Sequence, residues 1–254
     1  MTLIESLGLG LIQGLTEFFP ISSSAHLILL RPVFGFGEPN LWFDVFLHGG
    51  TWLAVLFYLI PHYRRLWEKP FLIVSILLAT IPAGAFGLLF EEPVEQSLRT
   101  HYPVIITVLI GLGVVFLFVR QSGEKPLESL GPGGALFIGL AQALALLPGV
   151  SRSGITLLAA LALGLQRKDA VLFSFFLSLT TIGGALAKGT LEMRAEGAVA
   201  LAELLPGFLV SLGSGFFACL FLLRIVAGRS LWPFGLYRII FGVGIMLFLL
   251  FSGG

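Results

Sequence analysis

The sequence predicts an all-α polytopic membrane protein, built as an inverted repeat with two re-entrant helical hairpins and about six full transmembrane spans. Three observations support this fold. The 254 residues are 57% hydrophobic and only 11% charged, with a mean hydropathy of +0.99, whereas a soluble domain carries about 25% charged residues. Polar residues gather in two short knots, and the chain resembles itself at an offset of about 130 residues. We therefore expect a single integral membrane domain over residues 1–254.

Six apolar runs each approach the ~20 residues that a spanning helix needs; they cover 41–60, 71–90, 103–119, 170–187, 204–226 and 233–251. Two further regions, 3–30 and 133–166, are interrupted by Pro20 and Pro148. Proline removes a backbone donor and breaks a helix. Broken backbone at membrane depth is tolerated only where it is buried or lines a wet cavity. We interpret both regions as re-entrant hairpins whose tips carry the polar knots.

The two halves of the chain match at several places in the same order. Three pairs of motifs share the offset: Gly10-Leu-Ile-Gln13 with Gly139-Leu-Ala-Gln142, Pro20 and Ser23 with Pro148 and Ser151, and Tyr102-Pro103 with Trp232-Pro233. The last pair is followed in each half by two glycines, Gly111 and Gly113 or Gly242 and Gly244. Chance similarity between apolar segments rarely recurs three times in order. We predict internal repeats over about 1–125 and 130–254.

Loop charge predicts the orientation. Lysine and arginine gather near 61–70, 120–131, 166–169 and 224–230, whereas the predicted loop 91–102 is acidic. The positive-inside rule places the four basic loops in the cytoplasm and hence both termini outside. The first hairpin then enters from outside and the second from inside. Their tips meet near mid-membrane, where such folds bind their ligands.

The first knot carries the only acid in its hairpin tip. Ionisable groups are costly in hydrocarbon and mark functional sites. Gln13 and Glu17 are four residues apart, so they share a helix face and could hold a divalent cation or orient a water; helix packing is the alternative for Gln13. A lone buried carboxylate would become neutral unless a charge faced it. We therefore predict a functional role for Glu17.

Three serines and a histidine follow Pro20. Ser22, Ser23 and Ser24 can cap the second half-helix. Ser22 and Ser23 stand four and three residues before His26, so either hydroxyl could share a face with the imidazole, as a nucleophile and its base do. The alternative for His26 is a hydrogen-bonded core histidine.

The second knot offers a guanidinium where a half-helix begins. Ser151 and Ser153 flank Arg152. A helix N-terminus is a ready anion site, and arginine adds a planar fork that fits two phosphate oxygens. A structural pair between Arg152 and Glu17 is a compatible alternative, and Thr156 could bond back to its own helix instead of to a ligand. The two knots together predict a site for a phosphate-bearing ligand.

Net charge and absent motifs give no support to nucleic-acid binding, nucleotide binding or classical zinc chemistry. The net charge of +1 suggests no nucleic-acid partner, and no Walker loop, CxxC or HExxH motif is present. The single Cys219 cannot form an intrachain disulfide. We assign interfacial or packing roles to Asp44 and His48, and a structural role to Arg238.

At these residues the chain resembles the BacA-type undecaprenyl pyrophosphate phosphatases of bacterial envelopes. The family's first signature is matched by Gln13, Glu17, Phe18, Pro20, Ser22, Ser23 and His26, and its second by Pro148, Gly149, Ser151, Arg152, Ser153, Gly154 and Thr156. Similarity extends through Phe43-Asp-Val-Phe-Leu-His48 and Leu236-Tyr-Arg-Ile-Ile240, and so covers essentially the whole chain. Two departures stand out: Gln13 is the neutral form of the first acidic position, and Ala25 stands where glycine is usual.

The resemblance implies a bacterial cell-membrane enzyme, linked to bacitracin resistance, that hydrolyses undecaprenyl pyrophosphate on the extracytoplasmic side and so recycles the lipid carrier of cell-wall synthesis. Its expected catalytic residues are Glu17, Ser23, His26 and Arg152, and its expected phosphate-binding residues are Ser22, Ser24, Ser151, Arg152, Ser153 and Thr156. Mg²⁺ or Ca²⁺ would bind near Glu17, with Gln13 as a second ligand. The nucleophile is Ser23, His26 or water, with Ser23 preferred. The partners are the prenyl diphosphate and membrane lipids, and the oligomeric state, a homo-oligomer included, stays open.

A secondary transporter or flippase of lipid phosphates is the alternative function, because inverted repeats with broken helices are its usual architecture.

Overall fold

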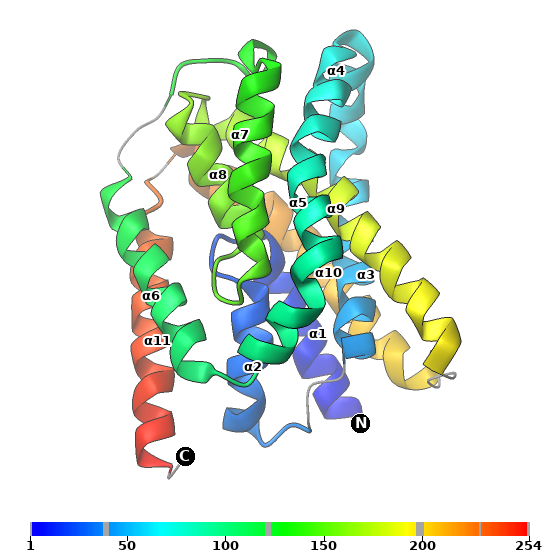
Figure 1. Ribbon diagram of the computed structural model, residues 1–254, viewed down its shortest axis with the longest axis vertical. Helices are drawn as coiled ribbons and strands as arrows, with labels where there is room; N and C mark the ends of the chain where they lie inside the picture. Colours follow the sequence, from blue (N-terminus) through cyan, green and yellow to red (C-terminus); the bar gives the residue numbers. More distant parts are fainter. Residues whose placement is uncertain (1, 38–40, 120–122, 197–200, 229, 253–254) are drawn as a thin grey trace.

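The computed structural model describes residues 2–37, 41–119, 123–196, 201–228 and 230–252, and these residues form an all-helical bundle (Figure 1). Within them, five helical stretches are long and apolar enough to cross a membrane: Phe43–Glu68, Phe71–Phe90, Arg167–Leu191, Leu204–Val226 and Trp232–Phe251. The predicted polytopic membrane protein is confirmed. The sixth predicted span, 103–119, is a shorter apolar helix of 17 residues, Tyr102–Phe118.

The elements follow one another in the order α1 (Leu3–Phe18), α2 (Ser23–Phe34), α3 (Leu41–Leu59), η1 (Ile60–His62), α4 (Tyr63–Glu68), α5 (Phe71–Leu98), α6 (Tyr102–Phe118), η2 (Leu127–Ser129), α7 (Pro132–Ala143), η3 (Leu144–Leu146), α8 (Arg152–Ala162), α9 (Arg167–Glu196), α10 (Leu201–Gly228) and α11 (Trp232–Phe251).

One predicted loop is wrong. The acidic segment predicted as a loop over 91–102 is helical as far as Leu98, because α5 continues past its apolar part. Hydropathy falls after Phe90, but glutamate, glutamine and leucine are good helix formers, so the fall in hydropathy does not end the helix.

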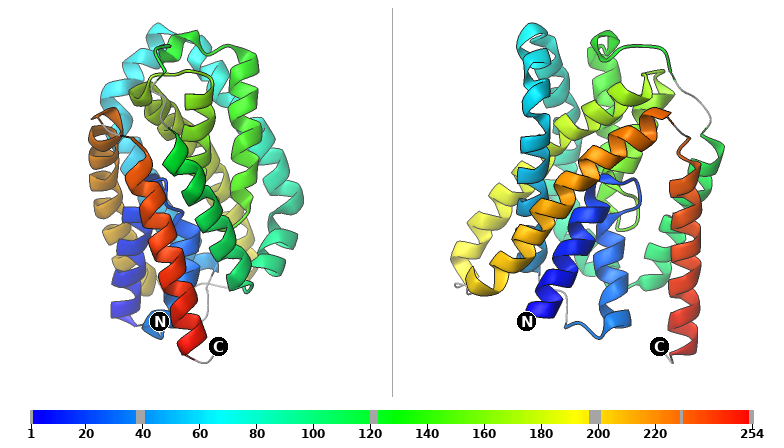
Figure 2. Two further views of the ribbon diagram at one scale, coloured as in Figure 1. Left: turned by 90° about the vertical axis from the view of Figure 1, so that its left-hand side faces the viewer. Right: turned by 180° about the vertical axis from the view of Figure 1, so that it is seen from behind.

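The two interrupted regions form helical hairpins. The pairs α1–α2 and α7–α8 start from opposite ends of the bundle, and their tips lie near its middle (Figures 1 and 2). The α1 helix packs on α10, and α7 packs on α5. Glycine allows both contacts: a Cβ on Gly10 would lie 2.3 Å from the Gly207 carbonyl oxygen, and one on Gly139 would lie 2.5 Å from that of Ala79. Each hairpin is therefore fixed against a helix from the other half of the chain.

The two hairpin tips share an unusual backbone conformation. Ser22 and Ser151 have φ of 73° and 71° and are the two non-glycine residues with positive φ in the described chain. Each is the N-cap of the second helix of its hairpin and accepts from the amide three residues on, at 3.4 Å from Ala25 N and 3.2 Å from Gly154 N. Such conformations cost about 1–3 kcal/mol each and cluster at functional sites. The sequence match had aligned Ser23, not Ser22, with Ser151.

A buried arginine joins the two tips. Arg238 on α11 is fully buried and donates to the carbonyl oxygens of Pro20 and Leu109, both at 3.1 Å, and to that of Gly149. Pro20 belongs to the first tip, Gly149 to the second, and Leu109 to α6. One guanidinium thus holds both breaks in fixed positions, and the three carbonyl oxygens accept hydrogen bonds from its buried N–H groups.

The ends of the bundle differ. Both termini lie at one end, and the segments at 60–70, 123–131, 163–166 and 230–231 lie at the other (Figure 2). At this second end Arg65 joins α4 to Glu128 and Asp169, at 2.6 and 2.8 Å. The hydrogen bond from Arg65 holds the pKa of Glu128 below its ordinary value. The described parts of the four predicted basic segments therefore share one end of the molecule, with Arg167 and Lys168 in the first turn of α9 and Arg224 in the last turns of α10; residues 120–122 and 229 lie outside the described residues.

Candidate active site

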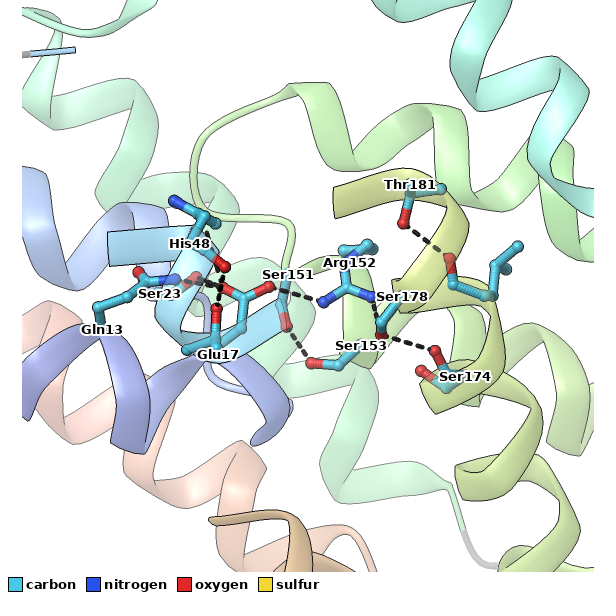
Figure 3. A network of polar contacts seen from close by, with 12 residues as sticks. Gln13, Glu17, Ser23, His48, Ser151, Arg152, Ser153, Ser174, Ser178 and Thr181 are labelled. Atoms are coloured by element: carbon cyan, nitrogen blue, oxygen red, sulfur yellow. Dashed lines mark hydrogen bonds and ion pairs between the residues drawn. The ribbon is translucent and has the colours of Figure 1, made fainter. Parts of the chain in front are cut away.

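Glu17 lies at the centre of a polar cluster between the two tips (Figure 3). Glu17 is only 6% exposed. One carboxylate oxygen, Oε1, accepts from Arg152 Nη2 at 2.6 Å. The other, Oε2, accepts from Ser23 Oγ at 2.6 Å and from Gln13 Nε2 at 3.0 Å. Residues of three helices thus satisfy this buried carboxylate, as a buried charge requires.

Arg152 opens α8 and spans from the first hairpin to α9. One arm of its guanidinium binds Glu17, and the other donates to the hydroxyl of Ser178. Ser178 in turn donates to the carbonyl oxygen of Ser174 at 2.8 Å. The Glu17–Arg152 pair that the sequence suggested is therefore present. Its position at the N-terminus of α8 adds free backbone N–H groups to the positive charge.

A cavity of about 470 Å³ adjoins this cluster, within the usual range for a small-molecule site. Its polar wall contains Glu17, Ser22, Ser23, Ser24, Ser151 and Arg152. Its other walls follow α5 from Thr80 to Leu88 and α9 from Thr180 to Lys188. Both helices run from the tips toward the end that carries the termini (Figure 1). The cavity therefore extends from the charged cluster at mid-bundle along walls that are mostly small or apolar, with threonines near the cluster and Lys188 at the far end of the α9 wall.

His26 takes part in a different set of contacts. Its Nδ1 donates to the Ser22 carbonyl oxygen at 2.7 Å, and its Nε2 lies 2.8 Å from the Tyr237 hydroxyl. The ring stacks on Phe241 with 4.1 Å between centroids. The predicted shared face with Ser23 is not formed, because the cap carbonyl and the aromatic rings of α11 hold the imidazole. It does not line the cavity beside Glu17.

Two residues that were predicted to bind phosphate, Ser153 and Thr156, form hydrogen bonds within the protein instead. Ser153 Oγ donates to the Phe19 carbonyl oxygen at 3.1 Å and so links the second tip to the first. Thr156 Oγ1 donates to the Arg152 carbonyl oxygen at 2.9 Å and lies 2.8 Å from Ser174 Oγ. The bond of Thr156 to its own helix is the alternative that the sequence left open. Neither residue lines the cavity. These contacts fix the position of α8.

His48, for which the sequence predicted an interfacial or packing role, lies at the site. His48 lines the cavity, and its Nε2 lies 3.6 Å from Glu17 Oε2. Its Nδ1 donates to the Asp44 carbonyl oxygen at 2.7 Å, which orients the ring. The signal was the Gly-Gly pair that follows it: a Cβ on Gly50 would lie 2.5 Å from the Phe208 carbonyl oxygen. Close packing of α3 on α10 therefore sets the position of the imidazole.

The oxygen ligands near Glu17 suit a divalent ion that is also bound by a substrate better than an ion held by protein side chains alone. In the described part of the chain, no three His, Cys, Asp or Glu side chains gather closely enough to hold a metal ion. Gln13 Oε1, however, is buried beside Glu17 and has no hydrogen-bond partner among the described residues. Mg²⁺ commonly uses one or two protein oxygens and completes its shell with substrate phosphate and water. Glu17 lines the cavity and can supply one such oxygen, and Gln13, which does not line it, would supply the second from within the protein.

The family described as "Bacitracin resistance protein BacA" matches residues 6–244. The chain belongs to the BacA family. Among its BacA-family relatives, the protein named undecaprenyl-diphosphatase from Alcanivorax borkumensis is 42% identical over 98% of this chain and 100% of its own. Proteins of the same name from Trichlorobacter lovleyi and Caldicellulosiruptor bescii are 41% and 40% identical, each over 98% of both chains.

Proposed function

We propose that this BacA-family protein hydrolyses undecaprenyl pyrophosphate to undecaprenyl phosphate and inorganic phosphate. The observation that carries the proposal is the convergence of one carboxylate, one guanidinium and two half-helix N-termini on a single cavity. Helix N-termini and arginine bind phosphate. The names of the relatives identify the lipid.

The chemistry starts from the Ser23–Glu17 hydrogen bond, whose heavy atoms are 2.6 Å apart. Ser23 Oγ attacks the terminal phosphorus and gives its proton to Glu17. The bond from that phosphorus to the bridging oxygen breaks, and prenyl monophosphate leaves with the proton that Glu17 had taken, which restores the carboxylate. Water then attacks the phosphoserine through the same carboxylate, and Ser23 recovers its proton as inorganic phosphate leaves. Arg152 turns from Glu17 to the phosphates and balances the charge of the transferring group.

A divalent cation, Mg²⁺ or Ca²⁺, belongs to the proposal. Glu17 and Oε1 of Gln13 would hold it together with substrate oxygens. When bound, it neutralises phosphate charge and orients the reacting groups.

Gln13→Glu tests the shared ion. The change should be tolerated, and half-maximal activity should need less Mg²⁺ or Ca²⁺, because a second carboxylate strengthens a cation site. Phosphate release over an ion titration measures this, with Gln166→Glu on the exposed surface as the charge control. Inactivity of Gln13→Glu at every concentration of both ions would contradict a cation shared by these positions, because two carboxylates without a cation only repel.

Phosphate release by the purified protein in detergent separates the enzyme from a transporter. An enzyme releases phosphate from the prenyl diphosphate without a membrane or a gradient. A protein that binds the lipid but releases no phosphate, at any ion concentration, would favour the alternative of a lipid-phosphate flippase.

The proposal extends to the architecture. The chain is an inverted repeat of about 1–125 and 130–254, and both hairpins are re-entrant, with α6 as a sixth span. The matching caps at Ser22 and Ser151 support the repeat. Bacterial membranes keep basic loops in the cytoplasm, so the end with the basic segments is cytoplasmic. The cavity extends toward the other end and is therefore extracytoplasmic.

Single cysteines test this orientation. In a Cys219→Ala background, Thr100→Cys should react with an impermeant thiol reagent added to intact cells, and Ser129→Cys should not. Both positions are exposed, and they lie at opposite ends of the bundle. Permeabilised cells, in which both should label, provide the control. The opposite labelling in intact cells would overturn the orientation.

Gly84→Leu tests whether the lipid occupies the apolar part of the cavity. Gly84 lies within α5 on the cavity wall, and a Cβ there would meet no atom within 4 Å. Leucine is also a better helix former than glycine. We expect a stable protein whose KM for a long prenyl diphosphate rises about tenfold, a loss of ~1.4 kcal/mol. Gly111→Leu on α6, equally uncrowded but outside the cavity, is the matched control. An unchanged KM for Gly84→Leu would place the prenyl chain elsewhere.

A further inference from the structure

Gln142 is a buried polar side chain that the mechanism has not used. It lies in the last turn of α7, is 2% exposed and lines the cavity. Neither its Nε2 nor its Oε1 has a hydrogen-bond partner in the described chain. An amide buried in this way costs stability unless something bonds to it. Its retention on the cavity wall points to a bond with a ligand.

The comparison with Gln13 shows why this amide is free. Gln13 and Gln142 occupy matching positions in the two hairpins, but Gln13 Nε2 donates to Glu17, four residues later. Four residues after Gln142 stands Leu146, which has no acceptor. The helix also ends at Ala143 and continues as the 3₁₀ turn Leu144–Leu146. The second hairpin thus keeps the amide and lacks its acid.

Among the described residues, no neighbour on the cavity wall forms a hydrogen bond with the Gln142 amide. Gly139, one turn earlier, packs against the backbone of Ala79 and fixes α7 against α5. The next residue of α5, Thr80, lines the same cavity, but its hydroxyl is already paired with Thr180 at 2.6 Å. Gln142 thus lines the cavity that Ser151 and Arg152 at the start of α8 also line.

We propose that Gln142 binds the diphosphate of the substrate, with its Nε2 donating to a phosphate oxygen; this rests on the proposed function. An amide N–H suits an anionic oxygen, and hydrogen bonds to charged acceptors are stronger than neutral ones. The residue is a binding contact supplied by α7, in addition to the contacts from α2 and α8. The two matching glutamines then have different partners. Gln13 donates to the Glu17 carboxylate, and Gln142 donates to the ligand.

The test separates binding from packing. Gln142→Leu keeps the approximate size and removes the donor. Replacing an unpaired buried polar group by an apolar one is neutral or stabilising, so Tm should stay or rise. KM for prenyl diphosphate should increase about 10-fold or more, with a smaller change in kcat. Gln142→Glu places a carboxylate beside the phosphates and should increase KM further. Such an increase would confirm that residue 142 acts as a hydrogen-bond donor to an anion.

A structural control and a non-hydrolysable probe complete the design. Ser211→Ala removes a fully buried hydroxyl that donates to the Leu47 carbonyl oxygen, outside the cavity, and should lower Tm while KM stays unchanged. Methylenediphosphonate binding to the detergent-purified full chain is measured by calorimetry. Weaker binding to Gln142→Leu, with Tm kept, supports the contact even if the wild-type protein hydrolyses no prenyl diphosphate, in which case only the proposed function fails. Binding equal to wild type, or a fall in Tm alongside the loss of binding, overturns it.

Discussion

Replacing Glu17 with glutamine is expected to abolish phosphate release while the protein stays folded. Glutamine keeps the shape of the side chain but cannot take the proton of Ser23, whose Oγ lies 2.6 Å from Oε2. Proton transfer by a positioned group contributes typically about 10²–10⁴-fold in rate. Arg152 loses its counter-charge and Tm should fall somewhat, but the Arg152 side chain is 14% exposed, faces the cavity and keeps its bond to Ser178.

The measurement is phosphate release and Tm on one preparation. Glu128→Gln is the matched control, because Glu128 is also paired with an arginine, at 2.6 Å from Arg65, but lies at the end away from the cavity. It should alter Tm and leave kcat unchanged. If Glu17→Gln kept more than about a tenth of wild-type activity, a loss of less than 1.4 kcal/mol in barrier, the carboxylate would have no catalytic role.

Arg152→Lys is expected to lower kcat by about 10²-fold or more, the loss typical of one preorganised donor. The guanidinium reaches Glu17 with one arm and Ser178 with the other. Lysine keeps the charge but acts as a point charge and cannot present a planar fork to two oxygens. The Michaelis complex should therefore form, and the transition state should lose most of its stabilisation.

Three roles of Arg152 give three different results. A purely electrostatic role predicts nearly normal kinetics, a structural pair with Glu17 predicts a low Tm with a modest kinetic change, and a phosphate clamp predicts low kcat. Arg65→Lys provides the control, because Arg65 forms a similar fork with Glu128 and Asp169 far from the cavity; it should lower Tm only. A stable Arg152→Lys variant with wild-type kcat would remove Arg152 from the clamp.

Local rules predicted the breaks and the main polar pair. Pro20 and Pro148 fall in the two interruptions, because proline lacks the backbone N–H of a continued helix; Pro32, Pro82, Pro93 and Pro206 lie inside helices, so proline alone does not decide a break. The spacing of Gln13 and Glu17 placed them on one helix face, and their hydrogen bond is present. Glu17 and Arg152 could be linked across 135 residues because both are charges in apolar surroundings.

Tertiary contacts decided what the sequence left undetermined. The spacing of Ser23 and His26 allowed a pair, but rings on α11 hold the imidazole elsewhere. His48 reaches Glu17 only because α3 packs closely on α10. Hydropathy alone ended α5 too early, because it measures where a helix leaves the apolar layer and not where the helix stops.

The packing of α1 on α10 also determines when the protein can finish folding during its synthesis. The hydroxyl of Ser6 accepts the amide of Gly207, 201 residues later in the chain. At the roughly 5–20 residues per second of translation, the first hairpin waits on the order of 10–40 s for its partner helix. Until then the glycine face of α1 has no close neighbour from α10, and the broken tip has no Arg238 to hold it. The segment that carries Glu17 is inserted first but reaches its final position only when nearly the whole chain has been made.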